Sequence, residues 1–186
     1  MGTLHYVATV SVDGYAADAD GDFQWSAPSD EVFDFHVERM ATVAVEVLGR
    51  RAYELMTYWE TYADPDGTPA EHEFARRWRG IEKVAVSSTL TDSELIGDRV
   101  RLVPRLPLEE LRDLVADAAD EVSIFGPTTA ADAIRAGLVD VVELFVVPKL
   151  VGGGLRALSE GARLDLRLDD RRVFGNGLVY LRYGRG

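Results

Sequence analysis

The chain has 186 residues, a formal net charge of −12 and no cysteine, and this length predicts one domain, residues 1–186, with a core large enough to fold without disulfides. The acidic balance argues against a nucleic-acid partner, while the missing thiolates and the scattered histidines (His5, His36 and His72) argue against a metal site. No apolar run approaches the roughly 18 residues of a membrane span and no signal pattern opens the chain, so we expect a cytoplasmic protein without a membrane partner.

Apolar periodicity and turn residues predict strands that alternate with helices along most of the chain. We expect, in order, a strand from residue 4 to a turn at Asp13-Gly14, a helix at 28–40, a strand at 43–48, helices at 50–57 and 69–78, strands at 83–87 and 100–103, a helix from Pro107, a strand at 121–125, a helix capped by Gly137, and a long strand ended by Pro148. The glycines at 152–154 indicate a flexible loop, and Asn176-Gly177 predicts the tight turn of a hairpin. This order predicts an α/β fold whose largely parallel sheet is finished by an antiparallel hairpin.

The first candidate site follows the strand at 43–48, where Gly49 precedes Arg50 and Arg51 at the start of a helix. A helix amino terminus carries roughly +0.5 of a unit charge and disfavours cations, so two arginines there need a reason. Either both are solvated and neutralised by nearby Glu54, or the helix end and the two guanidinium groups together bind an anion such as a phosphate. Gly49 would let the backbone approach that ligand closely.

Two more strand ends offer similar chemistry. Phe125 is followed by Gly126, Pro127 and Thr128 at the start of a helix, where backbone N–H groups are free. Ser87 and Ser88 stand at the end of another strand, the place where open α/β sheets bind ligands. Both segments also occur as ordinary helix starts and turns. The chain lacks the GxGxxG and GxxxxGK[ST] patterns, so neither a Rossmann domain nor a P-loop nucleotide site is predicted.

An acidic residue, Asp30, lies near the start of the helix at 28–40, a short distance after Trp25 and a polar loop. A carboxylate in a first helical turn usually does no more than interact favourably with the helix dipole. Its position beside an aromatic residue and a loop also makes it a candidate for a substrate contact.

Four motifs in this order resemble those of dihydrofolate reductases: WSAPSD (25–30), LGRRAYE (48–54), VSS (86–88) and FGPTTA (125–130). The segments SVDGYA (11–16) and AGLVDVVELFVVPKLVGGG (136–154) look more like the reductase domain of bacterial riboflavin-biosynthesis proteins and their stand-alone relatives. The resemblance runs from Leu4 to Tyr183. It implies a three-layer fold of the dihydrofolate reductase type, in which helices flank a mixed, mostly parallel sheet.

The resemblance also implies NADPH as the cofactor and cofactor contacts at Gly49, Arg50, Arg51, Ser87, Ser88, Gly126, Pro127 and Thr128. It implies substrate contacts at Trp25, Asp30 and Phe33, with Asp30 as the catalytic acid group. The expected activity is hydride transfer to a C=N or C=O bond of a pterin, a pyrimidine or a related small molecule. The reductase would be similar to dihydrofolate reductases or to 5-amino-6-(5-phosphoribosylamino)uracil reductases.

Two residues depart from the dihydrofolate reductase pattern. Ala52 replaces a threonine after the Gly-Arg pair, and Phe125 replaces the first of two glycines. These departures favour an alternative, a nucleotide- or pterin-binding module of the same fold without turnover. Because members of the similar family are often dimers, we expect a homodimer, with the apolar strands near the carboxyl end at its interface.

Overall fold

The structure is a computed structural model that describes residues 2–186. Its elements are β1 (Leu4–Ser11), β2 (Tyr15–Ala17), η1 (Gln24–Ser26), α1 (Asp30–Arg39), β3 (Val43–Gly49), α2 (Arg50–Thr61), α3 (Pro69–Gly80), β4 (Glu82–Val86), η2 (Asp92–Glu94), β5 (Val100–Val103), α4 (Leu108–Asp117), β6 (Glu121–Phe125), α5 (Pro127–Arg135), β7 (Val141–Val147), β8 (Leu155–Arg156), β9 (Leu166–Val173) and β10 (Val179–Arg185).

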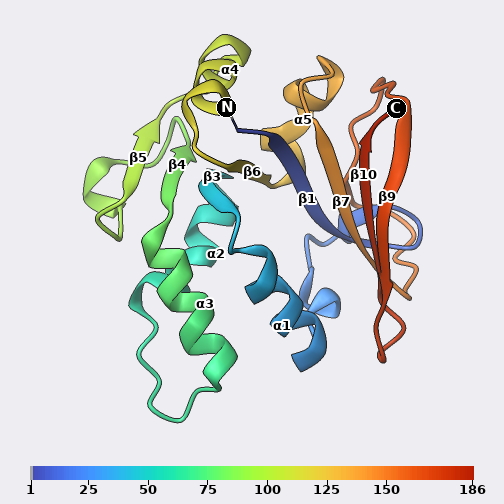
Figure 1. Cartoon of the computed structure of the whole chain (residues 1–186), viewed down its shortest axis with the longest axis horizontal. Helices are drawn as coiled ribbons and strands as arrows, with labels where there is room; N and C mark the ends of the chain where they lie inside the picture. The colour runs from blue at the N-terminus through green and yellow to red at the C-terminus, as the bar shows by residue number, and fades with distance from the viewer. Residues whose placement is uncertain (1) are drawn as a thin grey trace.

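One sheet of eight strands, in the order β5-β4-β3-β6-β1-β7-β10-β9, runs through the molecule (Figure 1). The six strands from β5 to β7 in this order are parallel to one another, and β10 is antiparallel to both β7 and β9. The predicted α/β fold with a mostly parallel sheet and a C-terminal antiparallel hairpin is therefore confirmed. The short strands β2 and β8, which pair with each other, were missed because they are too short to show periodicity.

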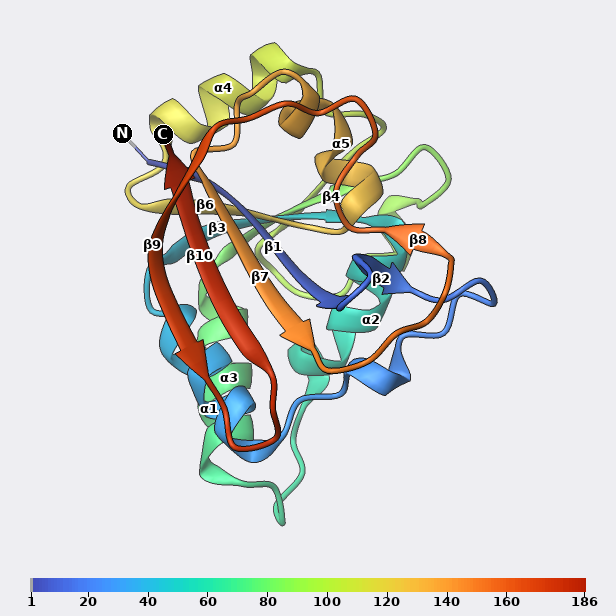
Figure 2. The ribbon, with the colours of Figure 1, turned by 90° about the vertical axis from the view of Figure 1, so that its right-hand side faces the viewer.

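Helices cover both faces of the sheet, and the alternation along β1 shows how. Tyr6 belongs to a core that includes Ile134 of α5 and Leu111 of α4. Its neighbour Val7 points to the other face and packs in a cluster with Val32 of α1. Figure 2 shows α4 and α5 on one side of the sheet and α1 and α3 on the other.

The helix after β3 is longer than its pattern predicted, since α2 runs to Thr61 rather than to residue 57. Its last turns are held by aromatic packing. The Trp59 ring lies 5.5 Å from that of Phe33 and 4.7 Å from that of Phe74, measured between centroids. Contacts between three helices, and not local propensity, therefore set the end of α2.

The glycines at 152–154 lie in a loop, as predicted, and hydrogen bonds hold the start of this run beside the residues that follow β1. The Asp13 carboxylate accepts hydrogen bonds from the backbone N–H groups of Gly152 (2.7 Å) and Val151 (3.2 Å). At Gly154, with φ of 128°, a Cβ atom would lie 2.2 Å from the Ala17 carbonyl oxygen. The glycine there is required for close backbone approach.

The hairpin predicted around Asn176-Gly177 joins β9 to β10, but its loop has three residues and is not a two-residue turn. Phe174 N–H donates to Leu178 O, and Gly177 N–H donates to Phe174 O, each at 2.9 Å. Gly177 adopts a φ of 84°, as the left-handed position of a three-residue hairpin loop requires.

β3 ends in close contact with α5. A Cβ atom at Gly49 would lie 2.4 Å from Thr129 Oγ1 but 3.8 Å from Thr129 Cβ. Gly49 has an ordinary φ of −71°, so a side chain here would meet the Thr129 hydroxyl, which would have to move, and would cause no backbone strain.

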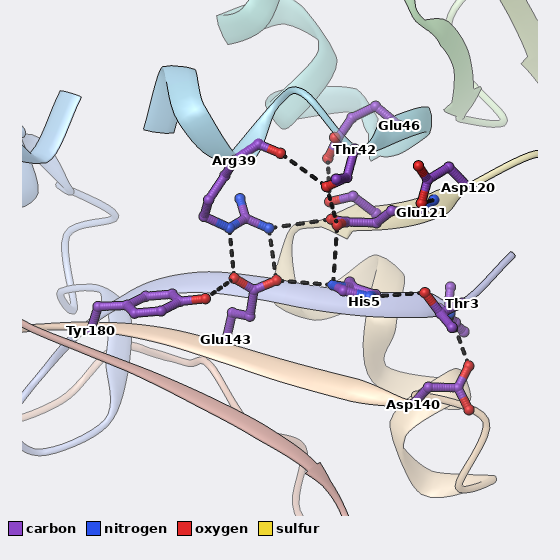
Figure 3. Close-up of polar contacts among 12 residues, drawn as sticks. Thr3, His5, Arg39, Thr42, Glu46, Asp120, Glu121, Asp140, Glu143 and Tyr180 are labelled. Atoms are coloured by element: carbon purple, nitrogen blue, oxygen red, sulfur yellow. Dashed lines mark hydrogen bonds and ion pairs between the residues drawn. The ribbon is translucent and has the colours of Figure 1, made fainter. Parts of the chain in front are cut away.

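A buried polar network lies beneath α1 (Figure 3). Arg39 donates to both carboxylate oxygens of Glu143, at 2.6 and 2.8 Å, and to Glu121 Oε1 at 3.2 Å. His5 Nδ1 lies 2.9 Å from Glu143 Oε1, and the Tyr180 hydroxyl donates to Glu143 Oε2. The network joins the end of α1 to four strands of the sheet.

The carboxyl groups of this region differ in charge because they differ in partners. Burial works to raise the pKa of Glu143, but hydrogen bonds from His5 and Arg39 outweigh it and lower that pKa below its usual value. Glu46, fully buried in β3, accepts one hydrogen bond, from Ser123 Oγ at 3.1 Å. Burial raises the pKa of Glu46 to about 8. Glu143 is thus the anion that faces Arg39, and Glu46 is protonated at neutral pH.

Replacement of Glu46 by glutamine should flatten the dependence of stability on pH. The pKa of Glu46 is higher in the folded than in the unfolded chain. The stability that protonated Glu46 gives the fold is therefore fully present below the pKa of an unfolded-chain glutamate and is lost as the pH rises toward 8. We expect the free energy of unfolding of the parent chain, relative to Glu46→Gln, to fall by roughly 1–4 kcal/mol between pH 5 and 8. Urea unfolding at several pH values measures this. The exposed Glu110→Gln is the control, and parallel profiles for parent and Glu46→Gln would contradict the assignment.

Gly49→Ala should destabilise the fold by about 1–3 kcal/mol, because the new methyl group overlaps Thr129 Oγ1. Thr129→Ala removes that oxygen, so the double variant should recover most of the loss in urea unfolding experiments. If the two substitutions simply add, the close contact between β3 and α5 is not what restricts residue 49.

Candidate functional site

Three of the predicted segments meet at one edge of the sheet. β4, β3 and β6 are neighbours and parallel, with Gly49 paired to Val86 and Leu48 paired to Phe125. Their carboxyl ends are therefore level. The segments that follow them, at 49–51, 87–88 and 126–128, lie side by side at the edge from which α2 and α5 begin (Figure 1).

The two arginines of α2 have different surroundings. Arg50 Nε donates to Glu54 Oε1 at 2.7 Å, and Arg50 Nη1 donates to Thr89 Oγ1 at 2.8 Å. The Arg51 side chain is exposed and has no hydrogen-bond or ion-pair partner within residues 2–186. Neutralisation by Glu54, one of the two predicted alternatives, thus applies to Arg50 and leaves Arg51 available to an anion.

The two serines after β4 also differ. Ser87 is buried, and its Oγ accepts hydrogen bonds from the backbone N–H groups of Thr89 (3.2 Å) and Leu90 (3.1 Å). Its hydroxyl therefore stabilises the turn. Ser88 is exposed at the same edge. Of the pair, Ser88 is the one whose side chain can reach a ligand without disrupting the turn.

The start of α5 has the geometry of an anion-binding helix end. Gly126, the N-cap, adopts φ of 112° and ψ of 124°, which residues with a Cβ rarely reach, and Pro127 occupies the first turn. Thr128 is exposed. The first N–H groups of the helix have no partner within it.

A groove of about 310 Å³ opens beside these strand ends, between α4, α5 and the sheet. Its polar side chains are Arg105, Thr128, Thr129 and Asp132, and its apolar floor includes Val47, Val86 and Ile124. Sequence analysis singled out only Thr128 from this set. Arg105 lies two residues after the end of β5, and its place near a strand end is the signal in the sequence that points to it.

The three predicted substrate contacts have different surroundings. Asp30 is the first residue of α1, is exposed, and has no side-chain hydrogen bond to any of residues 2–186. Trp25 lies in η1, where its Nε1 donates to the Asp22 carbonyl oxygen at 2.9 Å. Phe33 packs between α2 and α3, 5.4 Å from the Phe74 ring. Phe33 is therefore accounted for by the core, and its contact with substrate stays a prediction.

His5, Glu121 and Glu143 place ligand atoms within 4.8 Å of one another, all buried. This set was not predicted from the sequence. Glu143 does stand alone within an apolar strand, as Glu46 does, and that pattern indicates a buried polar partner. Arg39 already donates to both Glu121 and Glu143, so a cation would have to displace a guanidinium group. The contacts with Arg39 give these residues a structural role, which explains why they lie together.

Within residues 2–186, no helix combines the length and apolarity that crossing a bilayer requires.

Several known proteins are similar to this chain in sequence or in fold. The chain is 28% identical over 150 residues to the riboflavin biosynthesis protein RibD of Mycobacterium tuberculosis, an alignment that covers 81% of this chain and 43% of that protein. The chain thus spans less than half the length of that curated relative. A solved structure from Shewanella sp. PV-4, of a protein named for riboflavin biosynthesis, superposes with a TM-score of 0.76 at 24% identity and covers 99% of both chains.

Dihydrofolate reductase from Enterococcus faecalis, solved with NADP(H) and a compound named RAB-propyl, has the same fold. It superposes with a TM-score of 0.62 at 16% identity, over 100% of this chain and 97% of that one. The family described as the RibD C-terminal domain matches residues 3–180. By that match, which takes in every strand and helix from β1 to α5 and the edge where the candidate site lies, this chain belongs to the RibD C-terminal domain family, within the dihydrofolate reductase-like fold.

Proposed function

We propose that the chain is an NADPH-dependent reductase that acts on a C=N or C=O bond of a pyrimidine, a pterin or a related small molecule. The observation that carries this proposal is the groove at the carboxyl edge of β3, β4 and β6, where Arg105 and Thr128 stand beside the free start of α5. Membership of the RibD C-terminal domain family supports a reductase.

The residues at this edge fit a dinucleotide with several phosphates. The N–H groups at the start of α5 and the Thr128 hydroxyl suit a pyrophosphate, since a helix amino terminus favours anions. Arg51 and Arg105 are the cations available to a further phosphate, and Arg50 is available once Glu54 releases it. These three arginines offset the repulsion between the phosphates and a chain whose net charge is −12.

When bound, NADPH would supply the hydride. The chain's own part is to hold donor and acceptor at reacting distance and to exclude water. Asp30, exposed and unpartnered within residues 2–186, is available to accept hydrogen bonds from a ring N–H and an amino group. It would thereby orient the substrate and favour protonation of the reduced nitrogen.

One observation favours the alternative of a binding module without turnover. Arg50 is already paired with Glu54 and Thr89, so one expected phosphate contact is occupied by the chain itself. Ala52 and Phe125, the two departures from the dihydrofolate reductase pattern, both pack against the core cluster of α1, α2 and α3. They are accounted for by packing and do not discriminate between the two functions.

NADPH should raise the thermal stability of the protein, by about 2.7 kcal/mol at a concentration of 100 times Kd. Arg51→Ala and Arg105→Ala should each weaken NADPH binding by roughly tenfold or more, the loss expected for one charged hydrogen bond. Thermal unfolding with and without NADPH measures the first effect, and calorimetric titration measures the second. Arg112→Ala, an exposed arginine of α4 outside the groove, is the matched control. Equal affinities for all four proteins would place the cofactor elsewhere.

The same protein should oxidise NADPH in the presence of dihydrofolate or 5-amino-6-(5-phosphoribosylamino)uracil. Strong stabilisation by NADPH without oxidation across a wider panel of pterins and pyrimidines would instead establish the binding module.

Asp30→Asn should lower turnover by roughly 10²- to 10⁴-fold, the range for a group that assists proton transfer, while the affinity for NADPH and the melting temperature stay close to those of the parent. Steady-state kinetics at several pH values check this. Full turnover in a correctly folded Asp30→Asn protein would remove Asp30 from the mechanism.

A further inference from the structure

α1 packs against the C-terminal hairpin as well as against other helices. The Phe35 ring lies 4.8 Å from the Tyr180 ring in an edge-on arrangement and 5.6 Å from that of Phe174. Phe174 and Tyr180 flank the loop that joins β9 to β10, and both are buried. One face of α1 thus packs against the tip of the hairpin.

Polar contacts also join the hairpin to the first turn of α1. Glu31 Oε2 accepts a hydrogen bond from the Gly175 backbone N–H at 2.9 Å. The Arg172 guanidinium lies over the rings of Phe35 (5.1 Å) and Phe174 (4.9 Å), and its nitrogens approach Glu31 at 3.8 Å and Glu38 at 3.9 Å. Exposed ion pairs of this length contribute little by themselves, but here they surround a backbone hydrogen bond whose donor is fixed by the three-residue loop.

The far end of α1 is fixed independently. Arg39 is held by Glu143 and Glu121 in the buried network, so the last turn of the helix cannot shift without breaking those ion pairs. The first turn has no anchor of that kind. Asp30 itself makes no side-chain hydrogen bond within residues 2–186, and the place of its carboxylate is therefore set by how the first turn is held.

We propose that the C-terminal hairpin positions Asp30 for the substrate, with Arg172 and Glu31 as positioning residues. This inference rests on the proposed function, in which Asp30 contacts the substrate. The hairpin clamp, defined as Arg172, Phe174 and Gly175 acting on Glu31 and Phe35, fixes the direction in which the first turn of α1 points. It links the last strands of the sheet to a residue near the start of the chain.

The test compares four proteins: the parent, Arg172→Leu, Asp30→Asn and the double variant. Arg172→Leu should lower kcat/KM for the better of dihydrofolate and 5-amino-6-(5-phosphoribosylamino)uracil by roughly three- to tenfold, the effect of losing one contact that fixes geometry. It should leave the Kd for NADPH unchanged. In the Asp30→Asn background the same substitution should have no effect, because a residue that acts through Asp30 has nothing left to position.

Arg171→Leu is the matched control, since Arg171 pairs with Leu181 and Arg172 with Tyr180, which puts the two arginines on opposite faces of the sheet. It should leave kcat/KM as in the parent. The proposal would be overturned if Arg172→Leu caused equal losses in the parent and in the Asp30→Asn background, or if Arg171→Leu caused the same loss.

Amide hydrogen exchange gives a readout that does not depend on turnover. Arg172→Leu should speed exchange in the first turn of α1 and leave its last turn, held by Arg39, unchanged. If none of the four proteins oxidises NADPH, the proposed function has failed, and hydrogen exchange alone then tests the hairpin clamp. Faster exchange confined to the first turn of α1 supports the clamp, and unchanged exchange overturns it.

Discussion

The candidate site depends on the level ends of three parallel strands. Because β4, β3 and β6 are paired in register, with Gly49 beside Val86 and Leu48 beside Phe125, the segments after them meet at one edge. Parallel pairing requires a crossover between strands, and α2, α3 and α4 supply the crossovers that bring these distant segments together. A slip of one residue would turn the strand's side chains to the other face and move its end out of line.

The two faces of the sheet differ in their chemistry. The face beneath α4 and α5 is apolar and forms the floor of the groove. The face beneath α1 holds an ion-pair network, which in a core of this kind is costly to bury and must be fully paired. Glu143 meets that requirement with four hydrogen bonds from His5, Arg39 and Tyr180, and Glu46 meets it by remaining protonated. Through Arg39, the Glu143 network fixes the end of α1 on the sheet.

Local signals in the sequence were sufficient for the order of the main strands and helices and for the edge at which three of the candidate segments meet. Gly126-Pro127 and Gly137 predicted where α5 begins and ends, because such residues act on their own backbone. Two of the differences concern contacts between distant segments. The length of α2 depends on Trp59 meeting Phe33 and Phe74, and the Gly154 loop depends on Ala17, which no local pattern contains. Glu54, the predicted helical neighbour of Arg50, does pair with it. Phe33 is placed by the core and Arg50 is also bound by Thr89, and those neighbours only the fold supplies.

A crystal structure of the protein with NADPH tests the central claim most directly, namely that the level ends of β3, β4 and β6 form a phosphate-binding edge. The account predicts that the pyrophosphate lies at the start of α5 and that Arg51 and Arg105 turn toward phosphate oxygens. NADPH bound at another surface, or a strand edge filled by water while the cofactor binds elsewhere with measurable affinity, would contradict it.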